Sequence, residues 1–181
     1  MVIGRVSLLF CLAALAGCDA PQGPDAQELR NIHPAHILPK SSPRQLTAVF
    51  EHICLDTPPG AAAQALRGMD YVEVPRRASP GIGSGDGAIR SFAVDDRRPA
   101  VMLAADGSAC AVAAAARTGQ TGRIHDMVAR RFPAAAPVDP ARLGPRVERA
   151  WAIAPGQVVL LQRPYGPGQP PALILAIVGP G

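Results

Sequence analysis

Aromatic residues and lysine are scarce in this sequence. Phe, Trp and Tyr make up 4% of the 181 residues, and Lys40 is the sole lysine among 18 basic residues. A nucleic-acid-binding surface combines a run of basic residues with interleaved aromatic side chains. The arginines here stand singly or in pairs, and the formal net charge is only +4. The composition therefore excludes such a surface, and we expect no nucleic-acid partner.

Motifs of catalysis and metal binding are also missing. The nucleophile motif Gly-x-Ser-x-Gly, zinc-ligand spacings, the EF-hand loop and haem motifs do not occur. His52 and His125 are the candidate general bases, and each has an acidic neighbour, but no nucleophile motif accompanies either. We expect no catalytic residue, no cofactor and no metal, so an enzyme is the least favoured class of function.

Three short patterns resemble ligand sites superficially. The glycine-rich run Gly81–Gly87 lacks the strand, the helix and the Lys-Ser/Thr pair of a phosphate-binding loop. His33 and His36 are three residues apart, but the proline between them disfavours the helix that would aim both at one metal. The pair Asp95-Asp96 lies between two expected strands and is interpreted as a charged loop. We assign no site to these patterns.

The N-terminal segment is interpreted as an export signal. A positive start ends at Arg5, and the apolar stretch that follows is too short to span a bilayer, which needs roughly 20 apolar residues. It ends in Leu15-Ala16-Gly17-Cys18, which resembles the lipobox of bacterial lipoproteins. The resemblance implies that residues 1–17 are a signal peptide and that Cys18 carries lipid as the first mature residue. An ordinary cleaved signal and an uncleaved anchor are the alternatives.

The domain boundaries follow from composition. Residues 18–42 are rich in proline and polar residues, and their apolar residues do not recur at a regular spacing. This pattern predicts a flexible tether. As a coil, such a tether reaches roughly 25–30 Å. Residues 43–181 are expected to form one globular domain. The lipid would hold this domain at the cell envelope, facing the periplasm, with the choice of inner or outer membrane left open.

Four cysteines are present, and two of them belong to the export segment. Cys11 would leave with the signal, and Cys18 would carry lipid. Cys54 and Cys110 remain as a pair in a domain expected in an oxidising compartment, so we predict that they form a disulfide. The alternative is two separate buried thiols. No Cys-x-x-Cys spacing supports a redox role.

Helix signals are clearest at the start of the domain. Ser42 is a typical N-cap, Pro43 suits the first helical position, and Gln45 completes a capping box. Apolar residues then recur at helical spacing as far as Cys54. Two further helices are predicted, over residues 61–67 and 122–132.

Strands dominate the rest of the domain. They are predicted over 71–74, 89–94, 100–105, 108–115, 147–154, 157–163 and 172–178, the last of them central and buried on both faces. The turn Asp106-Gly107 predicts a hairpin in which Leu103 faces Cys110, on the side that receives the first helix. The order α-α-β-β-β-α-β-β-β predicts an α+β fold, with an antiparallel sheet of about five to six strands and three helices packed on it.

These observations favour a lipid-anchored interaction or structural module of the cell envelope. Its attachment to the membrane would be through Cys18, and its partner would be an envelope protein. The alternative is a small-ligand binding or sensory module, because the layout resembles profilin-like and PAS-like sensor sheets. That alternative would need an apolar pocket lined by strand residues.

Overall fold

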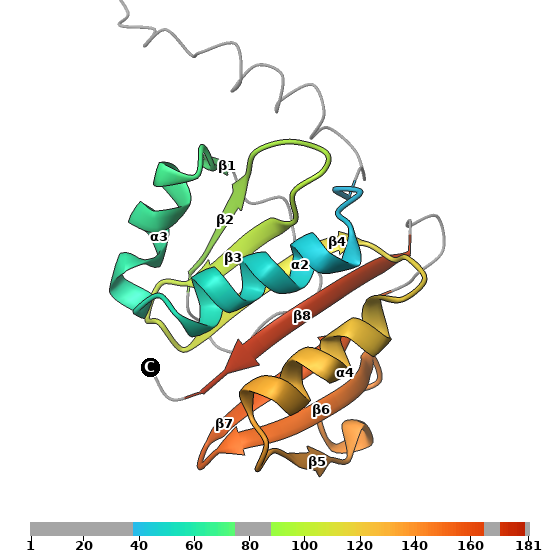
Figure 1. Cartoon of the computed structure of the whole chain (residues 1–181). Helices are drawn as coiled ribbons and strands as arrows, with labels where there is room; N and C mark the ends of the chain where they lie inside the picture. The colour runs from blue at the N-terminus through green and yellow to red at the C-terminus, as the bar shows by residue number, and fades with distance from the viewer. Residues whose placement is uncertain (1–37, 75–87, 165–170, 180–181) are drawn as a thin grey trace, which may run out of the picture.

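The computed structural model describes residues 38–74, 88–164 and 171–179. It confirms the α+β class, with three helices and one antiparallel sheet (Figure 1). The sheet has eight strands, where the sequence predicted five to six. The described helices are α2 (Pro43–Val49), which continues as the π-helix η1 (Phe50–Leu55), α3 (Pro59–Gly68), α4 (Gln120–Arg131) and the short 3-10 helix η2 (Pro140–Arg142).

The eight strands form two meanders joined in the middle of the sheet. The strands are β1 (Val72–Val74), β2 (Ile89–Ala93), β3 (Ala100–Ala104), β4 (Ala109–Ala115), β5 (Ala136–Val138), β6 (Val147–Ala154), β7 (Gln157–Gln162) and β8 (Ala172–Val178). Their order in the sheet is β1-β2-β3-β4-β8-β7-β6-β5, and every neighbouring pair is antiparallel. The pairing of β4 with β8 therefore joins the two halves of the chain.

The predicted order of elements was wrong in having three strands in each half. Each half has four. The three-residue edge strand β1 lies within the strand predicted over 71–74, which the predicted order left out, and the three-residue edge strand β5 was not predicted. Pro137 lies within β5, in a run of alanine and proline that shows no alternation of apolar and polar residues. Proline lacks the N–H that a central strand must donate, so it is tolerated in an edge strand. Pairing with β6 forms this strand, rather than any local preference.

The first helix begins where the sequence predicted. The Ser42 side chain accepts a hydrogen bond from the Gln45 N–H at 3.2 Å, and Pro43 is the first helical residue. The helix then widens into η1, where the Asp56 N–H donates to the carbonyl of Glu51 five residues earlier. The chain also contacts the sheet before this helix, because the Ala115 N–H donates to the Pro39 carbonyl at 2.9 Å.

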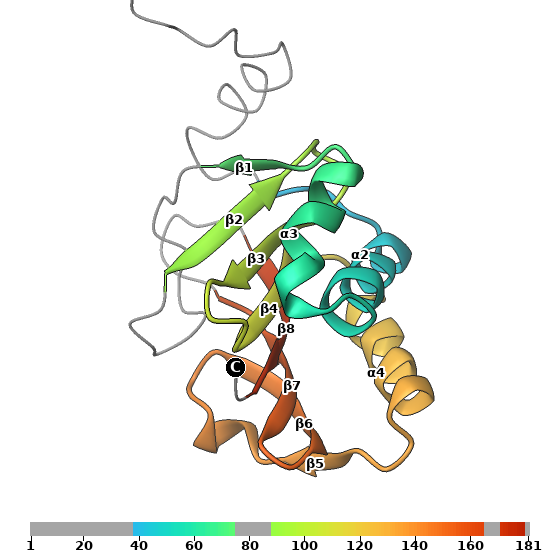
Figure 2. The same ribbon diagram turned by 90° about the vertical axis from the view of Figure 1, so that its left-hand side faces the viewer.

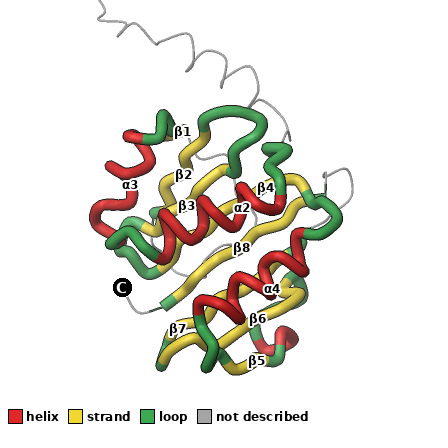
Figure 3. Tube along the Cα trace, viewed as in Figure 1, coloured by secondary structure: helices red, strands yellow, loops and turns green. Residues whose placement is uncertain are grey.

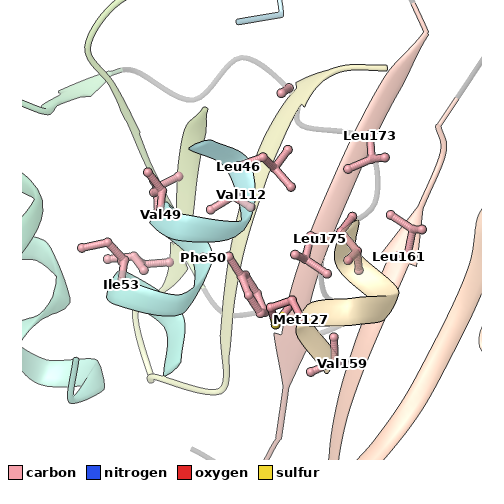
Figure 4. Packing of buried hydrophobic residues seen from close by; sticks show 14 of the residues in the cluster. Leu46, Val49, Phe50, Ile53, Val112, Met127, Val159, Leu161, Leu173 and Leu175 are labelled. Atoms are coloured by element: carbon pink, nitrogen blue, oxygen red, sulfur yellow. The ribbon is translucent and has the colours of Figure 1, made fainter. Parts of the chain in front are cut away.

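The helices cover one face of the sheet and bury the main core. Figure 2 shows α2, α3 and α4 on the same side of the strands, and Figure 3 shows α2 and α4 side by side. Phe50, Val112 and Leu175 are each 0% exposed and belong to the cluster beneath these helices (Figure 4). The central pair of strands thus supplies the floor on which both helices pack.

The opposite face of the sheet is apolar as well. Met102, Leu160 and Ile174 belong to a second buried cluster there, together with small alanines of the central strands. None of the helices α2, α3 and α4 lies over this face (Figure 2). The prediction that residues 172–178 form a central strand buried on both faces is confirmed, because β8 contributes to both clusters.

Candidate functional site

The two cysteines predicted to pair are bonded. Cys54 of η1 and Cys110 of β4 form a disulfide with their Cα atoms 5.4 Å apart, within the usual range for such bonds. The predicted hairpin register is also confirmed, because Leu103 pairs with Cys110 across β3 and β4. The disulfide therefore links the first helical segment to the centre of the sheet. Cys18, the predicted lipid attachment site, lies outside the described residues.

Among the described residues, the weaker candidates for chemistry do not form a site. His33, His36 and the run Gly81–Gly87 lie outside the described residues. His52 on η1 and His125 on α4 are exposed, and His125 lies 3.8 Å from the carboxylate of its neighbour Asp126. In the described part of the chain, no group of three or more His, Cys, Asp and Glu side chains is arranged to hold a metal ion.

Asp95 organises the loop between β2 and β3. Its carboxylate accepts hydrogen bonds from the Arg97 and Arg98 N–H groups at 2.8 and 2.7 Å, and from the Arg98 guanidinium at 2.8 Å. Burial alone would raise the pKa of Asp95, but these hydrogen bonds outweigh it and hold the pKa below its ordinary value. The Arg98 guanidinium also donates to the Met69 carbonyl at 2.8 Å. The acidic pair is therefore part of a charged loop, as predicted, that ties β3 to the end of α3.

Asp95→Asn is expected to lower the free energy of unfolding by about 1 kcal/mol at neutral pH, because it removes charge-assisted hydrogen bonds from a partly exposed loop. A carboxyl whose pKa is lowered by folding stabilises the protein above its unfolded pKa. That contribution disappears as the pH falls through the folded pKa. Urea unfolding at several pH values should show the gap closing in acid. Asp96→Asn is the matched control, and an equal gap at all pH values would contradict the argument.

A groove between α2 and α4 is the candidate site. It has a volume of about 570 Å³ and is open to solvent. Thr47 and Met127, which are 6% and 1% exposed, lie on opposite walls at its base. Most of the remaining lining residues recur three or four positions apart along the two helices, so one stripe of each helix faces the groove. They are Arg44, Ala48, Glu51, Gly119, Gly122, Arg123, Asp126 and Arg130.

The charges of the groove are unevenly paired. At one end, the Arg130 guanidinium contacts the Glu51 carboxylate at 2.6 Å, and the Glu51 side chain is only 20% exposed. Arg44 and Arg123 form no ion pair within the described ranges 38–74, 88–164 and 171–179. The groove therefore offers two guanidinium groups that can meet an anionic partner.

Buried polar contacts hold the start of α4 in place beside α2. The Gln120 side chain is 0% exposed, and it accepts from the Arg117 N–H at 2.7 Å and donates to the Ala115 carbonyl at 3.1 Å. In the next position, the Thr121 hydroxyl accepts from the Arg163 guanidinium at 2.7 Å. These bonds attach α4 to the ends of β4 and β7, which sets one wall of the groove.

The sequence did not reveal this groove. The prediction began α4 at residue 122, two residues late, because the N-cap is Gly119, which has no side chain to form a recognisable capping motif. The spacing of Arg44, Ala48 and Glu51 on one helical face is visible in the sequence, but its meaning depends on α4 lying beside it. The scattered arginines indicated only that a nucleic-acid-binding surface is absent.

A second hollow of about 130 Å³ adjoins the disulfide, where Leu103, Cys110 and Ile177 contribute strand residues. It is smaller than the roughly 300–1,000 Å³ of typical ligand pockets.

None of the helices in the described part of the chain is long and apolar enough to cross a membrane. The chain matches no protein-family model, no curated protein and no solved structure.

Proposed function

We propose that this chain is a lipid-anchored interaction module of the cell envelope. In this proposal, Cys18 carries lipid, the tether predicted over residues 18–42 ends where Pro39 bonds to β4, and the α+β domain binds an envelope protein on the periplasmic side. The motif Leu15-Ala16-Gly17-Cys18 at the end of an apolar stretch supplies the anchor. Two or more acyl chains on one cysteine would make the attachment effectively permanent.

The observation that carries the proposal is the disulfide between Cys54 and Cys110. Structural disulfides persist in secreted and periplasmic proteins and are rare in the reducing cytosol. The bond joins residues 56 positions apart, so it closes a long loop within the domain. An oxidising compartment is the environment that an export signal at residues 1–17 would reach.

The groove between α2 and α4 supports an interaction role. Its lining is charged, and the guanidinium groups of Arg44 and Arg123 form no ion pair within the described residues. Surfaces that recognise partners carry exposed complementary charges of this kind.

Replacing the predicted lipid attachment residue tests the anchor. We expect the wild-type protein to sediment with membranes, to partition into detergent and to have the mass of an acylated chain that begins at Cys18. Cys18→Ser should move the protein into the soluble fraction, because no thiol remains to carry lipid. Cys11→Ser is the matched control, since that cysteine belongs to the predicted signal, and it should leave attachment unchanged.

Two results would overturn this proposal. One is a wild-type mature protein that stays water-soluble after export. The other is a chain that keeps residues 1–17 and remains in the cytosol. Intact-mass spectrometry of the purified protein distinguishes both from the expected acylated form.

A further inference from the structure

The shape of the groove between α2 and α4 comes from small residues on both walls. Ala48 lies on one wall, and Gly119 and Gly122 lie on the other. A Cβ atom added at either glycine would have no neighbouring atom within 4 Å. From Arg44 to Glu51 the groove runs about 10 Å at 1.5 Å per helical residue. That length accommodates about three residues of an extended chain.

The charged side chains that line the groove have a net positive charge. Three arginines and two acids line it, and the contact between Arg130 and Glu51 neutralises one pair. Arg44 and Arg123 then share the lining with a single remaining acid, Asp126, whose side chain is 82% exposed. Guanidinium groups present planar, paired donors that match the geometry of carboxylates. A ligand that carries carboxylates would satisfy both arginines.

The same lining distinguishes a peptide from a membrane surface. Anionic membranes attract clusters of four to eight basic residues that lie together on an exposed face. Here the arginines line a recess that also holds Glu51 and Asp126, and a flat bilayer cannot follow its floor. A peptide can place acidic side chains at Arg44 and Arg123 and leave uncharged ones near Asp126.

The geometry points to this groove as the docking site for a short acidic segment of a partner protein. This inference rests on the proposed function as an interaction module and names the chemistry of its partner. Arg44 and Arg123 bind the carboxylates of the segment, and the space beside Ala48, Gly119 and Gly122 receives its backbone.

Fluorescence anisotropy with a defined probe tests the inference. The purified full-length protein is titrated into a fluorescein-labelled peptide of alternating Glu and Ala, and into the same peptide with Gln in place of Glu. An ionic strength of about 0.15 M screens the general attraction of a basic protein for acids. We expect saturable binding of the Glu peptide and about tenfold weaker binding of the Gln peptide.

Two pairs of variants assign the binding to the groove. Arg44→Gln with Arg123→Gln should weaken binding of the Glu peptide by about tenfold or more. Arg97→Gln with Arg142→Gln removes the same charge from exposed positions outside the groove and should leave binding unchanged. Gly122→Trp should fill the groove and abolish binding, whereas Gly122→Ala leaves it open and should bind like the wild type.

Several outcomes would overturn the inference. It fails if the peptide shows no saturable binding, or if the control pair of arginine variants weakens binding as much as the groove pair. It also fails if vesicles of equal phosphatidylglycerol and phosphatidylcholine, rather than the peptide, bind in a manner that needs Arg44 and Arg123. Circular dichroism of each variant checks that the fold is kept. None of these results would affect membrane attachment through Cys18, which has its own test.

Discussion

The double variant Cys54→Ala with Cys110→Ala is expected to lower the free energy of unfolding by about 4 kcal/mol. The bond closes a loop of 56 residues, and in the chain-entropy model a loop of that length costs the unfolded state about 14 cal/mol/K of conformational entropy. The bond also holds η1 against β4, beside the main core. Urea unfolding of the wild type and the double variant, both without reductant, measures the difference.

Reduction of the wild-type protein provides the control for this prediction. A thiol reductant should lower the unfolding midpoint of the wild type toward that of the double variant and should leave the variant itself unchanged. If the double variant unfolds at the same urea concentration as the oxidised wild type, the bond contributes no stability. Mass spectrometry of the wild type under non-reducing conditions checks that Cys54 and Cys110 are linked in the purified protein.

Phe50→Ala is expected to destabilise the domain by about 3–5 kcal/mol, because it removes a large side chain from the buried core and leaves a cavity. Phe50 is 0% exposed and lies where α2 passes into η1 (Figure 4). The free energy of unfolding of a small domain is only about 5–15 kcal/mol, so this change alone would remove a large part of it. Thermal and urea unfolding, followed by circular dichroism, measure the loss.

The matched control for Phe50 is a large apolar residue on the surface. Leu143 is 41% exposed, and Leu143→Ala should change the free energy of unfolding by less than about 0.5 kcal/mol. Phe50→Leu keeps most of the buried volume, so its effect should lie between the two. Equal effects of Phe50→Ala and Leu143→Ala would show that the helices do not pack on the sheet as described.

The groove lies where the predicted tether joins the domain. Arg44 follows the helix cap Ser42 by two residues, so the end of the groove with Arg44, which forms no ion pair among the described residues, is the end nearest the start of the domain. Glu51 and Arg130 close the opposite end. A lipid-anchored module that docks its partner in this groove would hold the partner close to its own tether.

The features predicted well are those that depend on neighbours in the chain. The helix cap at Ser42 acts on the N–H of Gln45, three residues away. The Asp106-Gly107 turn sets the register of β3 and β4 because Gly107 adopts the positive φ of 77° that the turn requires. The disulfide could be predicted because a helical period and a hairpin register, inferred separately, place both sulfurs at one helix–sheet interface.

The features that were missed depend on contacts between distant segments. β5 forms because β6 pairs with it, and its proline makes it look like a linker in the sequence. The shift from α2 to the wider turns of η1 at Phe50 has no local signal either. The groove requires α2 and α4 to lie side by side, although more than 60 residues separate them in the chain.

By itself, the sequence determined the α+β class, the start of the first helix, the β3–β4 hairpin, the central position of residues 172–178 and the pairing of Cys54 with Cys110. These follow from caps, turns and apolar periods, which act over a few residues. Only the tertiary structure decided that β4 and β8 join two meanders into one sheet of eight strands, and that arginines of α2 and α4 line one groove. Burial of apolar faces from opposite halves of the chain selects those arrangements, and no short stretch of sequence contains that information.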